Sequence, residues 1–497
     1  MPQMKRIGPV FYLSASVILL IVIFGALNPS MLESATAHAQ DFISQAFGWY
    51  YLIIVFIFVV ICLFFIVGPY GKIKLGKDTD KPEFNYVTWF ALLFSAGMGT
   101  GLVFWGAAEP LSHYLIDAPT TTEGSAAAVL DSMSHVYFHW GLHAWGIYAI
   151  VAICLAYFKF RLDAPGLISA TLSPLLNTSG TTGKFIDIVA IIATVCGVAT
   201  TLGFGATQIN GGLTFMTGIG ESFLFQVLII IVITALFLLS SYTGIHKGIK
   251  YLSNTNMLLA AFLLIFVMIT GPTLFNLNIL TQSFGQYLQT IPEMSFRAAP
   301  DNSDLRAWTE DWTIFYWAWW IAWAPYVGTF IARVSRGRTL REFTIGVLLV
   351  PSVLSFIWFA FLGGTTIHAE QTLNLGLDEL ATEEMLFGVL TTLPFPTIMS
   401  ILALILIAVF FITSADSASF VLGMHSTNGS TNPPTRIKMT WGLLLSAIAT
   451  ILLYSGGLQA LENTMIVAAF PFSVVMILMV LSLFKALKNE KRKRTSS

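Results

Sequence analysis

Long apolar runs separated by short polar stretches dominate the chain from end to end. A transmembrane α-helix needs about 20 predominantly apolar residues, and the runs have that length. The pattern predicts an all-α membrane domain with twelve spans: 8–27, 47–68, 86–108, 136–158, 186–209, 222–241, 255–271, 312–332, 343–364, 395–415, 439–456 and 464–484. The first run reaches Asn28-Pro29 without a small-residue cleavage site, so we expect a retained span rather than a signal peptide.

The distribution of basic residues tests this count of spans. All but two of the 25 lysines and arginines lie before the first predicted span, after the last, or in alternate loops between them. The exceptions, Arg297 and Arg306, lie in the long connection 272–311. Positively charged loops face the cytoplasm, which predicts a multi-pass protein of the cell membrane with both termini cytoplasmic. The connection 272–311 is too long for a turn, and we expect it to contain a helix on the outer membrane surface.

Composition excludes several other classes of protein. Charged residues make up 10% of the chain, against about 25% in soluble domains. The formal net charge of −1 offers no field that would favour nucleic acid. Cys62, Cys154 and Cys196 each lie in an apolar run, without the spacing of a zinc site or a disulfide framework. Because paired carboxylates and nucleophile-and-base patterns are also missing, we expect no enzymatic activity and no cofactor other than a coupling ion.

Two predicted spans contain residues that weaken helices. The third span has Gly97, Gly99 and Gly101 at alternate positions, and the eighth has Pro325 and Gly328. We expect both helices to be interrupted near the middle of the membrane, where unwound backbone is tolerated only beside a cavity or other protein. The two spans run in opposite directions. They therefore predict an inverted repeat of spans 3–7 and 8–12, with a binding site between the halves.

Aromatic side chains gather in two of the spans. They are Trp140, Trp145 and Tyr148 in the fourth span, and Trp319, Trp320 and Trp323 in the eighth. At the helical period each set falls on one face. Tryptophans in membrane proteins usually mark the lipid interface, but the second set lies well inside its span. Two such faces together would form a box for a methylated ammonium group, which is held by ring quadrupoles.

Two pairs of polar residues have alternative interpretations. His139 and His143 are four residues apart, but no carboxylate or cysteine accompanies them on their span, so we expect polar packing near a helix end rather than a metal site. Thr413 and Ser414 are adjacent near the end of the tenth span. Their hydroxyls either bond back to their own helix or, with carbonyls of the broken third span, coordinate a hard cation such as sodium.

With these features the sequence resembles the betaine/choline/carnitine transporter family over nearly its whole length. The most specific segments are AGMGTGLVFWGAAEP at 96–110 and WTIFYWAWWIAWAPYVGTFIARVSRGRTLREF at 312–343. The resemblance implies a homotrimer with the leucine-transporter type of inverted-repeat fold. The implied parts are two extra helices in 1–85, a first repeat in 86–271, the outer connection 272–311, a second repeat in 312–484 and a basic tail 485–497.

The resemblance also implies a function. It is secondary active, sodium-coupled symport of glycine betaine or a related trimethylammonium solute by alternating access. Uptake of choline or carnitine, and proton coupling, remain alternatives. Freed backbone amides at Gly99 and Gly101, beside Met98, would hold the carboxylate of a betaine.

Further site residues follow from the same resemblance. It implies an aromatic box of Trp140, Trp145, Tyr148 and Trp320, with Trp319 and Trp323 on the exit side. One sodium ion would lie between the carbonyls of Ser95, Met98 and Phe410 and the hydroxyls of Thr413 and Ser414. Members with a second sodium site carry two threonines one turn apart in the fifth span. Here Val198 follows Thr194, and Tyr326 stands where phenylalanine is usual, so a second site would depend on Thr194 and Tyr326.

Overall fold

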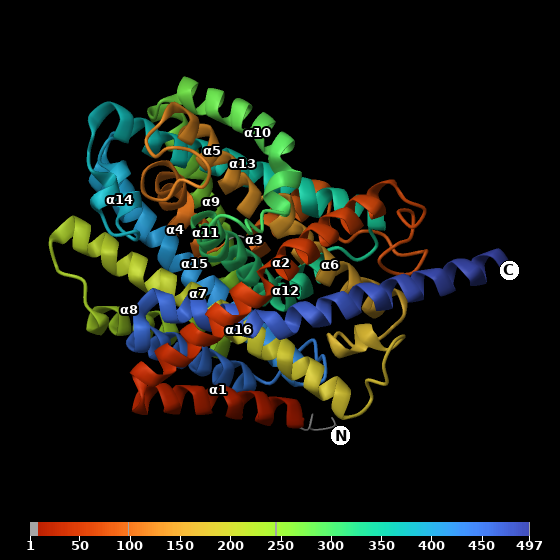
Figure 1. Ribbon diagram of the computed structural model, residues 1–497. Helices are drawn as coiled ribbons and strands as arrows, with labels where there is room; N and C mark the ends of the chain where they lie inside the picture. Colours follow the sequence, from red (N-terminus) through yellow and green to blue (C-terminus); the bar gives the residue numbers. More distant parts are fainter. Residues whose placement is uncertain (1–7, 98, 244–245, 497) are drawn as a thin grey trace.

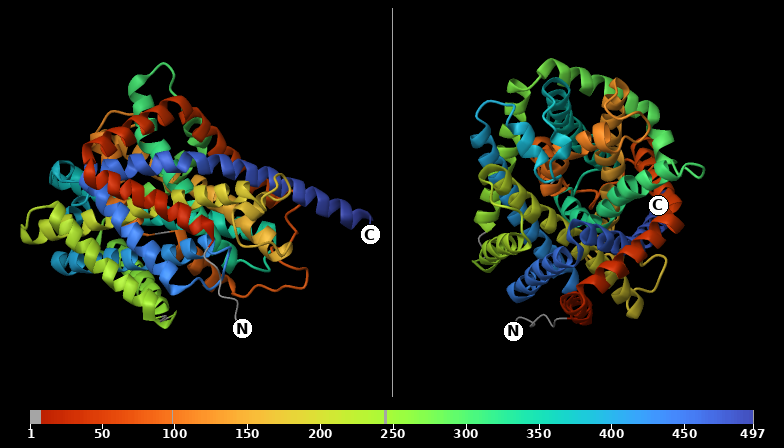
Figure 2. Two further views of the ribbon diagram at one scale, coloured as in Figure 1. Left: turned by 90° about the horizontal axis from the view of Figure 1, so that it is seen from below. Right: turned by 60° about the vertical axis from the view of Figure 1, so that its left-hand side comes forward.

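The computed structural model describes residues 8–97, 99–243 and 246–496. These residues form helices and their connections, with one isolated bridge between Lys74 and Thr339. The helices pack side by side around a buried core, and the C-terminal end of α16 projects beyond the rest of the chain (Figures 1 and 2). The chain is thus all-helical, as its apolar runs predict.

The N-terminal helices lie on the outside of the bundle. Helix α1 covers Pro9–Leu27 and α2 covers Pro29–Val67, and each begins with proline in its first turn. Proline is favoured there because its missing N–H would have no partner in the first turn. Helix α2 packs against α6 and α16.

The third predicted span is interrupted where its glycines predict. Helix α3 ends at Gly97 and α4 begins at Thr100, with Gly99 extended between them. Their bounds are Tyr86–Gly97 and Thr100–Leu111, and a π-helical turn, Ser112–Ile116, follows. A Cβ atom on Gly97 would lie 2.4 Å from a ring carbon of Trp145. Glycine therefore allows another helix to approach this backbone closely.

The fourth predicted span has a break that the sequence analysis did not predict. Helices α5, Ala126–Trp140, and α6, Leu142–Ala156, meet at Gly141, whose φ and ψ are −98° and −132°. A Cβ atom on Gly141 would lie 2.4 Å from the carbonyl oxygen of Tyr137 and 2.7 Å from the ring of Phe356. The break turns the helix at the residue after Trp140.

The remaining helices of the first half lead to the long connection. They are a π-helical turn at Tyr157–Arg161, a 3₁₀ turn at Ser169–Leu172, α7 at Thr181–Thr217, α8 at Phe223–Thr243 and α9 at His246–Thr270. The connection 272–311 contains α10, Thr273–Ser295, and α11, Ser303–Trp308. Helix α10 is bent by 108° from the end of α9 and runs along the edge of the molecule (Figure 1).

The eighth predicted span corrects one expectation. A π-helical turn, Thr309–Ile314, leads into α12, Phe315–Val334, which stays α-helical through Pro325 and Gly328. The predicted interruption is therefore wrong. Proline removes one backbone hydrogen bond, and within a bundle side chains and neighbouring helices compensate for such a loss. The helix here has neighbouring contacts that hold it in place, although none of them replaces the lost bond to the Ile321 carbonyl. The Thr329 hydroxyl donates to the Pro325 carbonyl at 2.7 Å, and Gly328 gives close contact with Val151 of α6.

The second half continues with long helices. They are α13 at Leu340–Leu373, a 3₁₀ turn at Leu377–Glu379, α14 at Met385–Leu390, α15 at Pro396–Ser426 and α16 at Thr435–Ser496. Thr339 and Glu342 form a capping box at the start of α13. Helix α16 is kinked at Gly456 and Gly457, which separates the last two predicted spans.

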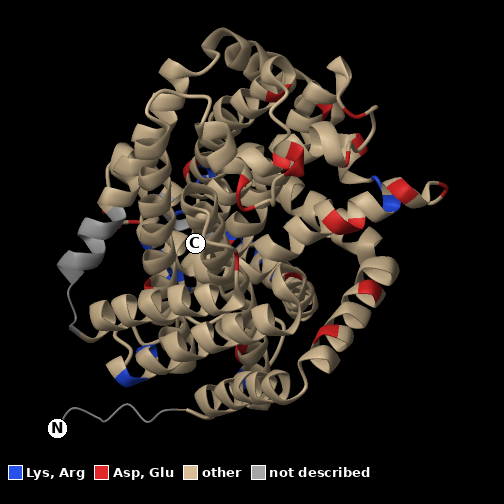
Figure 3. Cartoon of the chain, turned by 90° about the vertical axis from the view of Figure 1, so that its left-hand side faces the viewer, with Lys and Arg blue, Asp and Glu red and all other residues tan. Residues whose placement is uncertain are grey.

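Within the described residues, eight helices are long and apolar enough to cross a membrane, or nine if the bent α9–α10 pair is one span. This number is lower than the twelve predicted spans partly because α3 and α4 are each short and α16 contains two predicted spans. Figure 3 views the end of the molecule opposite the tip of α16, and carboxylates predominate there. The molecule is a multi-span membrane protein with an asymmetric distribution of charge.

Candidate functional site

Four aromatic rings predicted to form a box lie together in the core. Trp140 is the last residue of α5, Trp145 and Tyr148 lie on α6, and Trp320 lies on α12. The ring centroids of Trp140 and Trp320 are 5.0 Å apart, those of Tyr148 and Trp320 are 6.0 Å apart, and those of Trp145 and Tyr148 are 5.6 Å apart. All three pairs are edge-to-face, and each side chain belongs to a residue that is 3% exposed or less. We call these four residues the aromatic box.

Hydrogen bonds fix two rings of the aromatic box. The indole N–H of Trp320 donates to the backbone carbonyl of His139 at 2.9 Å, and that of Trp140 donates to the Glu109 carboxylate at 2.7 Å. The break at Gly141 lets Trp140 on α5 and Trp145 on α6 belong to the same box. The buried Tyr148 hydroxyl has no hydrogen-bond partner among the described residues. A buried polar atom of this kind favours a ligand or water beside it.

The two other tryptophans of α12 lie along the same helix. Trp319 is stacked on Trp320, with centroids 5.0 Å apart and planes inclined by 7°. Trp323 is one turn further on, donates to the carbonyl of Gly197 at 2.9 Å and packs edge-to-face on Tyr326 at 5.6 Å. Helix α12 therefore carries two pairs of ring contacts, Trp319 with Trp320 and Trp323 with Tyr326.

A cavity lies beside α12. It measures about 530 Å³ and begins at Tyr326, next to Trp323. Its polar and charged lining includes Tyr326, Thr329, Asp416, Ser417, Lys159, Arg333 and Lys438. These cations come from loops or helix ends on the side that carries most of the basic residues. The cavity therefore lies on the basic side of the molecule, and its lining includes Tyr326 but none of the four rings of the aromatic box.

The opposite side of the aromatic box is filled by aromatic side chains. Tyr316 stacks on Trp319 and Trp320, with centroids 6.1 Å and 5.8 Å away. Phe204 and Phe315 pack on Trp319 at 5.3 Å and 5.6 Å. Tyr316, Phe204 and Phe315 are buried. Aromatic side chains are therefore packed on this side of the box, whereas the cavity lies on the basic side.

The glycines at the break of span three lie against α12 and α15. A Cβ atom on Gly99 would lie 3.4 Å from the Ser414 hydroxyl and 3.5 Å from the Trp323 ring. A Cβ atom on Gly101 would lie 2.4 Å from the Trp319 ring. The predicted carboxylate-binding stretch thus reaches Trp319, which stacks on a ring of the box. Met98, which belongs to both predicted sites, lies outside the described residues.

The predicted sodium ligands are only partly described. Ser95 lies in α3, and Ser414 is close to the break at Gly99. The Thr413 hydroxyl donates within its own helix, to the carbonyls of Val409 at 2.9 Å and Phe410 at 3.2 Å. Such a hydroxyl keeps lone pairs that can face a cation, so both interpretations of Thr413 remain consistent with its geometry.

The residues of the predicted second sodium site belong to different helices. The Thr194 hydroxyl on α7 donates to the Ala190 carbonyl at 2.8 Å. Tyr326 lies on α12 at the wall of the cavity. Helices α7 and α12 pack on each other, but these contacts do not by themselves define a set of ion ligands.

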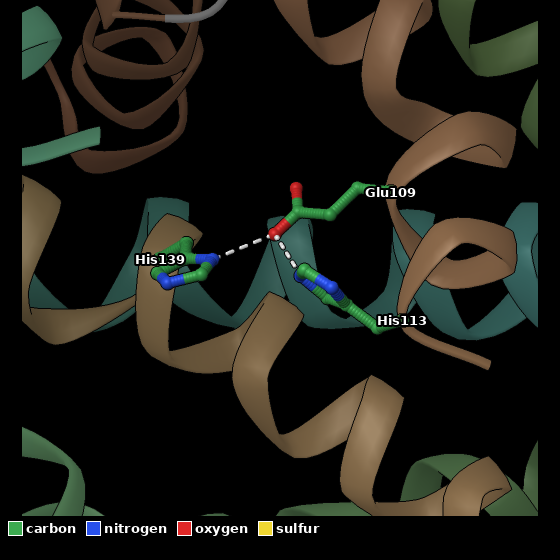
Figure 4. Close-up of side chains that lie close together, drawn as sticks. All are labelled: Glu109, His113 and His139. Carbon is green, nitrogen blue, oxygen red and sulfur yellow. Dashed lines mark hydrogen bonds and ion pairs between the residues drawn. The ribbon is translucent and has the colours of Figure 1, made fainter. Parts of the chain in front are cut away.

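A buried cluster that the sequence pattern did not predict lies beside the aromatic box. Glu109 of α4 lies between His113 and His139, and one carboxylate oxygen faces both rings (Figure 4). That oxygen is 2.7 Å from Nδ1 of His139 and 3.4 Å from Nε2 of His113. The span of His139 carries no carboxylate, as the sequence shows, and α4 supplies one from a neighbouring helix. A carboxylate inside an apolar run is itself a signal of function, and Glu109 carries that signal.

The same three side chains resemble a set of metal ligands. Their ligand atoms lie within 4.8 Å of one another. However, 2.7 Å between Oε1 of Glu109 and Nδ1 of His139 is a hydrogen-bond distance, and the second carboxylate oxygen accepts from Trp140 and Tyr316. The carboxylate is thus already occupied by hydrogen-bond donors. His143 instead contacts the Ser295 hydroxyl at 2.9 Å, as expected for polar packing.

Comparisons with known proteins identify relatives of this chain. A glycine betaine transporter, OpuD, of Bacillus subtilis (strain 168) is 55% identical over 99% of this chain and 96% of its own length. An ectoine/hydroxyectoine transporter of Virgibacillus pantothenticus is 42% identical over 98% of this chain and 97% of its own. A solved Na⁺-coupled sialic acid symporter aligns at 15% identity over 90% of this chain and 84% of its own, with a TM-score of 0.39, which is too low to assign a fold.

The family model of the betaine/carnitine/choline transporters matches residues 9–492. This match covers nearly all the described helices, including the aromatic box, the glycine break and the cavity. It also agrees with the expectation of a transporter rather than an enzyme. The chain belongs to the betaine/carnitine/choline family of transporters.

Proposed function

We propose that this protein is a sodium-coupled symporter of glycine betaine or a related trimethylammonium solute. The aromatic box carries the proposal. A quaternary ammonium group has no N–H to donate, so it is held by aromatic faces, at about 2 kcal/mol or more for a well-desolvated contact. The two relatives, named as transporters of glycine betaine and of ectoine/hydroxyectoine, support a compatible solute as the substrate.

The glycine break supports a substrate that also has a carboxylate. Helix α4 begins at Thr100 with no side-chain cap from Gly99. The first N–H groups of a helix lack internal partners and carry the positive end of its dipole, so they suit an anion. The Thr100 hydroxyl is buried and has no partner among the described residues, which gives one more donor at this helix start. Choline, which ends in a hydroxyl, would gain less from this arrangement.

Sodium coupling is supported by the contact between α15 and the break. Ser414 lies near Gly99, so hydroxyls of α15 and carbonyls of the unwound segment can share one cation. A second sodium at Thr194 and Tyr326 is part of the proposal only if uptake depends on more than one sodium ion. Proton coupling is the alternative, and uptake measured with and without a sodium gradient would reveal it.

Alternating access and assembly complete the proposal. The open cavity on the basic side and the aromatic packing on the other side correspond to one of the two states that alternating access requires. We place both termini in the cytoplasm, as the basic loops predict. We also propose the inverted repeat of spans 3–7 and 8–12 and a homotrimer in the cell membrane.

Uptake into proteoliposomes tests this function. Labelled glycine betaine is supplied with and without an inward sodium gradient, and unlabelled choline, carnitine and ectoine compete for uptake. We expect uptake that depends on the sodium gradient and is inhibited most strongly by betaine. Equal uptake without sodium would contradict the coupling, and stronger inhibition by choline would contradict the substrate.

A further inference from the structure

Glu109 is a fully buried carboxylate that binds rings of two helices. Its Oε2 atom accepts hydrogen bonds from the Trp140 indole at 2.7 Å and from the Tyr316 hydroxyl at 2.5 Å. Its Oε1 atom lies 2.7 Å from Nδ1 of His139. One side chain of α4 therefore joins the end of α5 to the start of α12.

Both rings bound to Oε2 belong to the site or support it. Trp140 is a wall of the aromatic box, and Tyr316 stacks on Trp319 and Trp320 with planes inclined by 25° and 24°. A displacement of either ring would change the shape of the box. The carboxylate thus holds two rings whose positions matter for a bound cation.

An ionised carboxylate suits this position better than an amide. It accepts at both oxygens and donates at neither, and three donors can converge on it here. A glutamine of nearly equal size would turn an NH₂ group toward one of these donors. Hydrogen bonds to a charged acceptor are also stronger than neutral ones, and Nδ1 of His139 lies within hydrogen-bond distance of the other carboxylate oxygen.

The carboxylate has a second effect on Trp140. An N–H that donates to an anion polarises its own ring, because hydrogen bonds in a low-dielectric interior reinforce one another. A more negative ring face attracts a cation more strongly. This effect is absent for a ligand that has the same shape but no positive charge.

We propose that Glu109 is a positioning residue of the transport site, which orients Trp140 and Tyr316 and strengthens the attraction of the aromatic box for a quaternary ammonium group. The proposal depends on the proposed function, because it assumes that the substrate cation lies in the box. Glu109 acts through the two rings and does not contact the substrate.

The test compares a cationic ligand with its neutral isostere. Glycine betaine uptake is measured in proteoliposomes, and 3,3-dimethylbutyrate, which carries a tert-butyl group in place of trimethylammonium, is used as an inhibitor. In Glu109→Gln we expect the KM for betaine to rise about tenfold, as for the loss of a charge-assisted hydrogen bond. The maximal rate and the inhibition constant of 3,3-dimethylbutyrate should change far less.

Glu370→Gln is the matched control. Glu370 is also a buried carboxylate, but it accepts from the backbone N–H groups of Gly376 and Leu377, at 3.2 Å and 3.1 Å, away from the rings. We expect a native KM for betaine in this variant. Tyr316→Phe, which removes one donor and keeps the ring, should raise the KM for betaine by about threefold, less than in Glu109→Gln because Trp140 keeps its hydrogen bond to the carboxylate.

The outcomes separate the two proposals. A native KM in Glu109→Gln would overturn the positioning role, and an equal loss of affinity for betaine and 3,3-dimethylbutyrate would overturn the strengthened attraction for the cation. If Glu109→Gln does not yield folded protein, Tyr316→Phe decides, and a native KM there would overturn the role. If the native protein takes up no betaine, the proposed function fails first, and this inference fails with it.

Discussion

Replacing Gly101 by alanine should displace the rings of the transport site. The new Cβ atom would lie 2.4 Å from Cη2 and 2.9 Å from Cζ2 of Trp319, whereas carbon atoms in contact are about 3.5–4.0 Å apart. The Trp319 ring must therefore move by about 1 Å. Because Trp319 is stacked 5.0 Å from Trp320, the displacement passes directly to the aromatic box.

The magnitude follows from the cost of overpacking. An extra methyl group in a well-packed core costs about 1–3 kcal/mol, which corresponds to a factor of roughly 5–150 in an equilibrium constant. If most of this cost falls on the state that binds substrate, we expect the KM for betaine to rise about tenfold. Gly99→Ala is the control, because its Cβ atom would meet Ser414 and Trp323 at 3.4 Å and 3.5 Å, which is ordinary contact.

The assay is betaine uptake kinetics of both alanine variants in proteoliposomes, together with their thermal unfolding in detergent. A native KM in Gly101→Ala, or an equal loss in Gly99→Ala, would refute the steric argument. Gly101→Asp brings a negative charge as well as the steric clash with Trp319. It is therefore compared with Gly101→Asn, which has nearly the same shape and no charge. Repulsion of the betaine carboxylate at 4 Å would cost about 4 kcal/mol at an effective dielectric of 20, and should shift preference toward choline only in the aspartate variant.

Three other predictions concern different parts of the molecule. Trp320→Leu should weaken betaine binding by about 1–3 kcal/mol, through the loss of a desolvated cation–π contact, and a native affinity by calorimetry would exclude Trp320 from the aromatic box. Thr413→Ala with Ser414→Ala should raise the sodium concentration needed for half-maximal uptake, whereas an unchanged sodium dependence would move the ion elsewhere. Desolvation and the nearby charge of Glu383 raise the pKa of Glu221 to about 7, so its contribution to stability is complete below its ordinary pKa and decreases as the pH rises through about 7. Thermal unfolding temperatures measured from pH 5 to pH 8 should fall less in Glu221→Gln than in the native protein.

The sequence predicted those features of the fold that depend on local residue preferences. The break at Gly99 was predictable because several glycines occur close together in one apolar run. The interruption predicted at Pro325 was wrong for a related reason. The sequence shows that proline weakens a helix locally, but it does not show the surrounding groups that hold the helix together. The break at Gly141 was not visible, because a single glycine gives no such pattern and the need for it arises from Tyr137 and Phe356.

The candidate site shows the same limit. Helical spacing placed Trp145 and Tyr148 on one face, and their rings do lie together. The partnership of Glu109 with His139 joins two helices, and periodicity along one chain segment gives no information on such a contact. The apolar runs therefore indicate which residues are buried, whereas the partners of buried polar groups become visible only when the helices are packed.

The aromatic packing on one side of the box has a consequence for throughput. With rings packed on one side of the box and a cavity on the basic side, the transport that we propose differs from flow through an open pore. In the alternating-access cycle that we propose, each molecule carried requires the packing of Tyr316 against Trp319 and Trp320 to open and re-form. Collective rearrangements of this kind take microseconds to milliseconds or longer. The rate at which a cell accumulates solute is therefore set by the number of copies of the protein and their cycling rate, and a steeper gradient can increase it only up to that ceiling.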